Sequence, residues 1–160
     1  MLRFDNGPAK TKWCHVVWPT YKRRELFKIP ATARFCERRL RDRCTGRGWH
    51  MDTAFLDDTQ VHVLLRAPAR LSRRAVTRIL QRTAGRALRQ TGAVPRWDHR
   101  LWDRWIWCSV LSSAPAVEAV RKWLMGKRGE LPWGIATPLL HPTGGGDGEV
   151  LSSGEAIVPP

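Results

Sequence analysis

The sequence predicts an α+β fold in which one antiparallel sheet is covered by helices, in the order β-α-β-β-α-β-α. Runs of β-branched and aromatic residues alternate with segments of helical periodicity, and the two middle strand-like runs are separated only by a short polar turn. The chain has 160 residues, of which 42% are hydrophobic, so it is long enough for one domain with a core of its own.

The first strand is predicted over residues 13–20, a β-branched and aromatic run that ends around Pro19. A helix is predicted over residues 30–45, because apolar residues recur there at helical spacing and Pro30 suits a first turn. Gly46 is expected to end this helix.

Two short strands are predicted over residues 49–56 and 61–66, joined by a hairpin turn at residues 57–60. A long helix follows, with Ser72 as its N-cap, a continuous apolar stripe, and an end at Gly92.

The last two predicted elements are a Trp-rich strand over residues 102–111 and a helix over residues 116–125. Pro115 opens this helix and Gly126 stops it. The first six elements have the split βαβ, ferredoxin-like pattern, which places the helices on one face of the sheet.

The net charge of +14 is unevenly distributed. Residues 1–127 hold 27 basic and 10 acidic side chains, a balance of +17, and form the predicted domain. Residues 128–160 hold one basic and four acidic side chains and are rich in Pro and Gly, so a disordered or extended tail is predicted.

This excess of positive charge favours a polyanionic partner, and nucleic acid is the expected one. No apolar run is long enough for a membrane span, and the N-terminal residues lack a signal-peptide core. We therefore expect a cytoplasmic, nucleoid-associated protein with no membrane partner.

The order of elements and five local motifs resemble the small single-tyrosine HUH transposases of bacterial insertion sequences, including the REP-associated kind. The segments that carry the resemblance are residues 15–24, 58–65, 80–88, 101–103 and 120–124. The resemblance implies a domain that cleaves and joins single-stranded DNA, in which two His and a polar residue hold a divalent metal and a Tyr forms a covalent 5′-phosphotyrosine.

The positions that should carry this chemistry are altered. By the resemblance, the first motif His is replaced by Gln60, the second is His62, the Tyr is replaced by Trp123, and the polar residue one turn later is Lys127. An indole has no oxygen nucleophile, and an ammonium group has no lone pair for a metal. The only Tyr in the chain, Tyr21, has no metal-site role in the family.

We therefore predict an inactive member of the family with no resident cofactor. Mg²⁺ or Mn²⁺ would bind only if Gln60 and His62 still hold an ion, because a Gln carbonyl oxygen can ligate either metal weakly.

Basic side chains remain where DNA binding is expected. Residues 72–92 contain no acidic residue and six arginines, five of which recur every three or four residues, a pattern that favours an anionic partner over an ordinary solvated helix face. The predicted nucleic-acid-binding residues are Lys22, Arg23, Arg24, Arg74, Arg78, Arg82, Arg86, Arg89 and Arg104. Trp97, Trp102 and Trp105 are interleaved with arginines, which suits stacking on unpaired bases. For Trp102, Trp105 and Trp107, packing in a core or a dimer interface is the open alternative.

The function predicted from the sequence is binding of hairpin or single-stranded DNA without cleavage, as a regulator or as a subunit of a larger DNA-targeting machine. By the resemblance we also expect a homodimer. Three alternatives remain open: an RNA-binding protein, a residually active metal-dependent endonuclease or transposase, and a protein-interaction subunit.

Overall fold

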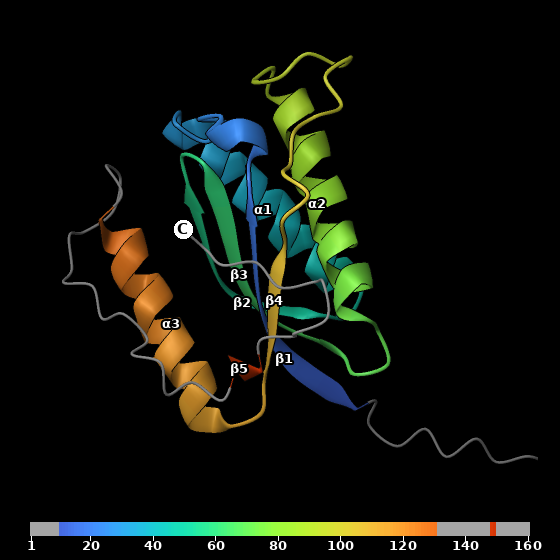
Figure 1. Cartoon of the computed structure of the whole chain (residues 1–160), viewed down its shortest axis with the longest axis vertical. Helices are drawn as coiled ribbons and strands as arrows, with labels where there is room; N and C mark the ends of the chain where they lie inside the picture. The colour runs from blue at the N-terminus through green and yellow to red at the C-terminus, as the bar shows by residue number, and fades with distance from the viewer. Residues whose placement is uncertain (1–9, 131–147, 150–160) are drawn as a thin grey trace, which may run out of the picture.

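The computed structural model describes residues 10–130 and 148–149 and confirms the predicted α+β class. Its sheet is antiparallel, with the strand order β2-β3-β1-β4-β5 (Figure 1). The elements are β1 (Thr11–Pro19), the 3-10 turn η1 (Tyr21–Arg23), α1 (Pro30–Gly46), β2 (His50–Asp57), β3 (Gln60–Pro68), α2 (Arg73–Gln90), β4 (Trp107–Leu111), α3 (Ala114–Gly129) and the two-residue β5 (Gly148–Glu149).

Strand β1 lies at the centre of the four longer strands and pairs with β3 along its whole length. This register places Val17 opposite His62. The predicted hairpin joins β2 to β3, and the side chain of Ser72 accepts a hydrogen bond from the Ala75 N–H, as expected of an N-cap. The pairing thus brings the first strand beside the motif that contains His62.

Helices cover both faces of the sheet: the two helices of the first six elements lie on one face, as predicted, and the seventh element covers the other face. Helices α1 and α2 pack on one face, whereas α3 packs on the other (Figure 1). Alternate residues of β3 explain this arrangement: Val63 joins the first core and Leu64 the second, and both are fully buried. A strand that is apolar on both faces needs cover on both.

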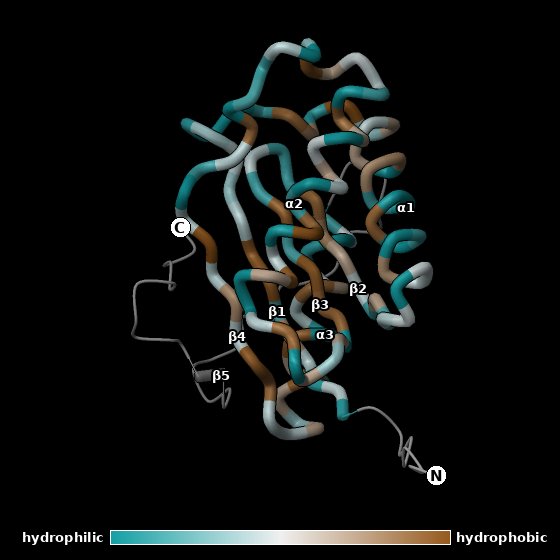
Figure 2. The backbone as a smooth tube through the Cα atoms, turned by 90° about the vertical axis from the view of Figure 1, so that its right-hand side faces the viewer, coloured by the Kyte–Doolittle hydropathy of each residue, from teal (hydrophilic) through white to brown (hydrophobic). Residues whose placement is uncertain are grey.

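Hydropathy along the chain follows the same layers. The middle of the sheet, around β1 and β3, is largely hydrophobic, whereas α1 alternates between hydrophilic and hydrophobic turns (Figure 2). The apolar side of α1 includes Ala33, Cys36 and Leu40, all buried in the first core. Each helix therefore buries one stripe and leaves its opposite side to solvent.

The strand predicted over residues 102–111 is shorter than expected and begins only at Trp107. Trp102 instead forms an isolated bridge with Thr20, and its indole N–H donates to the Gln81 carbonyl oxygen at 3.1 Å. The backbone at Trp102 still pairs beside the end of β1, since the Asp103 N–H donates to the Pro19 carbonyl oxygen at 3.1 Å. Only residues 103–106 interrupt the predicted strand.

Helix α3 also differs from the prediction, because it begins at Ala114 and continues through Gly126 to Gly129. Gly126 is buried, and Arg128 fixes the last turn by donating to the Glu37 carboxylate at 2.6 Å and to the Ala54 carbonyl oxygen at 3.0 Å. These tertiary bonds outweigh the low helix propensity of glycine.

The helix crosses the predicted domain boundary at residue 127 by two residues. The predicted disordered or extended tail otherwise lies outside the described residues, apart from residue 130 and the short strand β5. Within residues 10–130 and 148–149, no helix is long and apolar enough to cross a membrane.

Candidate functional site

His62, His15 and Trp123 meet on the α3 face of the sheet. His62 lies on β3 and is 2% exposed, and its Nδ1 is 3.3 Å from Nε2 of His15 on the neighbouring strand β1. The indole of Trp123 on α3 lies against His62, with ring centroids 5.2 Å apart, and Trp107 on β4 meets His15 edge-on at 4.7 Å. We call these four residues the His–Trp cluster.

Burial keeps both imidazoles neutral. Desolvation lowers the pKa of His15 to about 3. The pKa of His62 is held well below its usual value by desolvation and, in addition, by the nearby His15 and Lys127. In a neutral pair, one imidazole donates the shared proton and the other accepts it. The pair is therefore a hydrogen-bonded unit at neutral pH.

Six buried side-chain polar atoms have no hydrogen-bond partner among the described residues, and four of them lie in or beside this pair. They are the Gln60 side-chain oxygen, Nε2 of His62, the Trp123 indole nitrogen and the hydroxyl of Ser109, which is opposite His15 in the sheet. Buried polar groups are nearly always paired, so each exception calls for an explanation. The first three belong to the positions that the resemblance assigns to the metal and the nucleophile.

Lys127 follows Trp123 by one helical turn. Its ammonium lies 5.8 Å from the centroid of the Trp123 ring and 4.0 Å from the Glu130 carboxylate. Lys127 thus faces the His–Trp cluster and helps to lower the pKa of His62, so this side of the cluster disfavours further positive charge.

A divalent metal does not fit this donor set. The available ligands are the neutral Gln60 amide and the neutral His62 imidazole, and the ammonium of Lys127 stands where the third ligand is expected. Among the described residues, no group of three His, Cys, Asp or Glu side chains could hold a metal ion. Mg²⁺ and Mn²⁺ favour several oxygen ligands, carboxylates above all, and this set offers one neutral oxygen, that of the Gln60 amide.

Sequence reasoning missed His15 and Trp107 as members of the cluster. The available signal was the alternation of β1: His15 and Val17 share one face of the strand, and Val17 pairs with His62. The pairing partner was not evident from the sequence, so this signal could not be used.

The predicted basic face of α2 faces solvent. Arg74, Arg78, Arg82 and Arg86 are exposed, whereas the apolar stripe that includes Leu80 is buried against the sheet. Within the described part of the chain, Arg78, Arg82 and Arg86 make no ion pair with a carboxylate. Three cations spaced by one helical turn thus remain uncompensated.

Two predicted binding residues hold a loop in place. Arg24 forms an ion pair with Asp98 at 2.7 Å, and Arg89 donates to the Asp98 carbonyl oxygen at 2.9 Å. Both side chains are partly buried, so they fix the chain after α2 and offer less charge to a ligand than the exposed arginines do. Arg104 is exposed in the segment that leads into β4.

The other two, Lys22 and Arg23, lie in η1 and are exposed. Tyr21 precedes them, outside the His–Trp cluster, and its hydroxyl accepts a hydrogen bond from Arg100 at 3.3 Å. This bond and the charge of Lys22 lower the pKa of Tyr21. The structure therefore gives the only Tyr basic neighbours and keeps it apart from His62.

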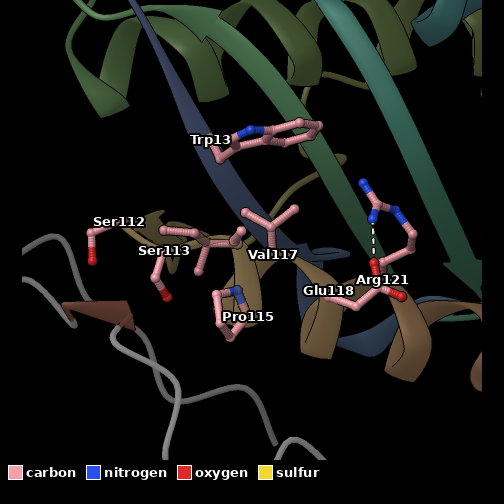
Figure 3. Close-up of a pocket in the computed structure, with 9 residues that line it drawn as sticks. Trp13, Ser112, Ser113, Pro115, Val117, Glu118 and Arg121 are labelled. Atoms are coloured by element: carbon pink, nitrogen blue, oxygen red, sulfur yellow. Dashed lines mark hydrogen bonds and ion pairs between the residues drawn. The ribbon is translucent and has the colours of Figure 1, made fainter.

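A cavity of about 580 Å³ opens at the start of α3 (Figure 3). Trp13 and Val117 line it, with Arg121 at one side. Arg121 donates to Asp52 through two bonds of 2.9 Å and also pairs with Glu118. Since two carboxylates neutralise this guanidinium, the cavity differs in charge from the α2 face.

Solved structures share this architecture. A candidate transposase from Deinococcus radiodurans R1 superposes with a TM-score of 0.57 at 18% identity, over 79% of this chain and 98% of that one. A REP-associated tyrosine transposase bound to a REP hairpin superposes with a TM-score of 0.52 at 10% identity, over 79% of this chain and 70% of that one. The fold is that of the tyrosine transposases.

The family follows from the sequence match. The model of the IS200-like transposases matches residues 9–126, and the chain belongs to this family. No curated protein matches the chain.

Proposed function

We propose that this member of the IS200-like transposase family binds hairpin or single-stranded DNA and does not cleave it. The observation that carries the proposal is the packing of Trp123 against His62, at the position where the resemblance places a nucleophilic Tyr. The hairpin bound to the REP-associated transposase of similar fold supports DNA as the partner class.

The chemistry at this position argues against cleavage. By the resemblance, the phosphodiester is transferred to the hydroxyl of a Tyr at this position, and the indole of Trp123 has no hydroxyl and no available lone pair. Its ring centroid is 5.2 Å from that of His62, so the volume beside His62 is filled by an aromatic side chain. The neutral Gln60 amide and the Lys127 ammonium further disfavour the divalent ion that would polarise a phosphate.

The charge on α2 argues for binding. Arg78, Arg82 and Arg86 form an exposed row without carboxylate partners in the described chain. Like charges at this spacing repel each other, and a phosphate backbone relieves the repulsion while it releases counterions. We expect the bound protein to be a homodimer that acts as a regulator or as a subunit of a larger DNA-targeting assembly.

The test combines a cleavage assay with a binding assay. Stem-loop DNA is incubated with the protein and Mg²⁺ or Mn²⁺, and products are separated under denaturing conditions. We expect no covalent protein–DNA adduct and no cleavage, together with hairpin binding at moderate salt. A covalent adduct would contradict the proposal that the protein does not cleave DNA. Failure to bind any hairpin would contradict the proposal that DNA is its partner. A matched RNA hairpin used as competitor tests the RNA alternative.

The unpaired atoms of Gln60 and His62 favour one second candidate, a residual metal-dependent nuclease. His62→Ala distinguishes the two functions. A residual nuclease would lose its activity in this variant, whereas a binding protein would keep its hairpin affinity as long as it stays folded. Circular dichroism of both proteins provides the folding control.

A further inference from the structure

We propose that Trp97, together with Lys22, Arg23, Arg96 and Arg100, forms a binding site for unpaired nucleotides that extend from the DNA bound by α2. We call these five residues the loop patch. The proposal rests on the DNA-binding function proposed above and adds a second, chemically different contact to it. Its elements are an aromatic face for bases and several cations for phosphates.

The exposure of Trp97 is the first observation. Its side chain is 76% exposed, more than any other large hydrophobic residue among those described; Ile29 follows at 62% and Trp105 at 56%. A Trp that packs in a core or on its own helix is largely buried. The ring of Trp97 therefore contributes little to the stability of the domain and remains available to a ligand.

The loop that carries Trp97 is held rigidly by polar bonds. Asp98 pairs with Arg24 at 2.7 Å, its carbonyl oxygen accepts from Arg89 at 2.9 Å, and its carboxylate accepts from the Arg100 N–H at 3.1 Å. Arg24 also donates to the Arg100 carbonyl oxygen at 3.2 Å. These bonds fix the backbone beside Trp97 and leave its ring free to contact a ligand. Such preorganisation lowers the entropy cost of binding.

Backbone strain marks the other half of the loop patch. Lys22 and Arg23 adopt φ angles of 49° and 56°, in the left-handed region that L-residues rarely occupy. Both side chains are exposed and basic. Strained, non-glycine residues concentrate at sites of function, and here the strained turn carries two neighbouring cations that face solvent.

Tyr21 joins the two halves of the loop patch. The Arg100 guanidinium donates to the Tyr21 hydroxyl at 3.3 Å and lies 5.8 Å from the centroid of its ring, and the Lys22 ammonium lies 5.5 Å from the same centroid. Tyr21 therefore holds Arg100 and Lys22 near each other. Within the described chain, Lys22, Arg23, Arg96 and Arg100 form no ion pair with a carboxylate.

This composition selects the chemical class of the ligand. An exposed apolar patch that docks a protein would bring further apolar side chains around Trp97, but the nearby residues Arg96, His99 and Arg100 are basic or polar. Several uncompensated cations in one patch with an exposed aromatic ring fit a polyanion that also offers flat rings, and unpaired nucleotides combine both.

The location is suited to this role. The loop patch lies at the C-terminal end of α2, where η1 and the loop after α2 come together (Figure 1). The Thr20 N–H donates to the Thr59 carbonyl oxygen at 2.8 Å, which connects η1 to the start of β3 and Gln60. A strand that leaves a duplex at this end of α2 would thus meet the loop patch.

The experiment compares binding of two kinds of DNA by fluorescence anisotropy. One probe is a blunt hairpin, and the others carry a single-stranded extension of about five nucleotides at the 5′ or the 3′ end, roughly the site size of one small single-strand-binding module. Trp97→Ala is expected to weaken binding of an extended hairpin about 5- to 20-fold and to change blunt-hairpin affinity less than about twofold, since each stacked base contributes about 1–3 kcal/mol. Trp97→Phe should restore most of the affinity. Met125→Ala, which removes another exposed apolar side chain on α3, is the matched control.

Four outcomes would overturn the inference. In one, the wild-type protein binds blunt and extended hairpins equally, which would leave the proposed DNA binding intact. In another, Trp97→Ala weakens binding of both probes by the same factor. The third is an equal reduction of affinity in Met125→Ala. Finally, failure of the wild-type protein to bind any hairpin would overturn the proposed function as well as this inference.

Discussion

Trp123 on α3 packs against His62 on β3, with ring centroids 5.2 Å apart and the two planes inclined by 60°. The contact joins the helix and the strand that carry, by the family resemblance, the nucleophile and a metal ligand. The rest of α3 is held by an apolar cluster that contains Leu64 and Leu124, both fully buried. The helix is thus docked by packing along its length, and Trp123 extends this packing to the His pair.

Restoring the tyrosine alone is expected to leave the protein without cleavage activity. Trp123→Tyr supplies an oxygen, but Gln60 and Lys127 still provide a poor metal site. Only the triple variant Gln60→His, Trp123→Tyr, Lys127→Gln should form a covalent adduct with stem-loop DNA in Mg²⁺ or Mn²⁺. The readout is a shifted band on a denaturing gel. An adduct in the wild-type protein or in Trp123→Tyr would show that these positions do not limit the chemistry.

Trp123→Phe should cost little stability, whereas Trp123→Ala should cost on the order of 2–4 kcal/mol because it leaves a cavity between α3 and the His pair. The indole nitrogen is buried without a partner in the described structure, so its removal breaks no hydrogen bond. Urea denaturation measures both free energies of unfolding. Lys122→Ala, an exposed residue of the same helix, is the control. A Phe variant as unstable as the Ala variant would contradict the idea that packing dominates.

Neutralising the α2 row should weaken hairpin binding and lower its salt dependence. For each of Arg78, Arg82 and Arg86 that neutralises a phosphate, its replacement by Ala should reduce the slope of log K against log salt by about 0.7–0.9. Titrations of the alanine variants at several salt concentrations measure the slope. Arg38→Ala and Arg39→Ala on α1, also exposed and basic, are matched controls and should have smaller effects. Equal effects on both helices would indicate a general charge effect with no defined interface.

Acid should destabilise the domain through the buried His pair. Unfolded His15 binds a proton below about pH 6.5, whereas in the fold its pKa is about 3, and the pKa of His62 is lowered as well. Protons therefore favour the unfolded chain, and the contribution of the neutral pair is complete above about pH 6.5 and lost as the pH falls. Between about pH 7.5 and pH 5, His15 alone should cost about 2 kcal/mol.

The measurement is the free energy of unfolding as a function of pH. The groups that act on the pKa of His62 are His15 from β1 and Lys127 from α3. The variant His15→Gln removes the first imidazole and keeps both His62 and Lys127, and its amide can still bond to His62. We expect a shallower pH dependence in this variant. An unchanged slope would mean that His15 does not titrate as its burial requires.

Much of the fold was predictable because its signals are local. The β-branched run of β1, the polar turn between β2 and β3, and the Ser72 cap of α2 each act over a few residues. The errors arose where distant contacts overrode local preference. The indole of Trp102 bonds to Gln81 and the predicted strand is interrupted after it, whereas Arg128 bonds to Glu37 and holds a helix past Gly126.

The sequence by itself determined the chemistry that is available: Trp instead of Tyr at residue 123, Gln at residue 60, and arginines without acidic neighbours on α2. Side-chain identity sets the nucleophile, the ligands and the charge, whatever the fold. Only the tertiary structure decided that His15 bonds to His62 from 47 residues away and that Asp98 occupies Arg24 while Trp97 stays exposed. Such contacts depend on strand register and helix docking, which are set by the packing of the whole chain.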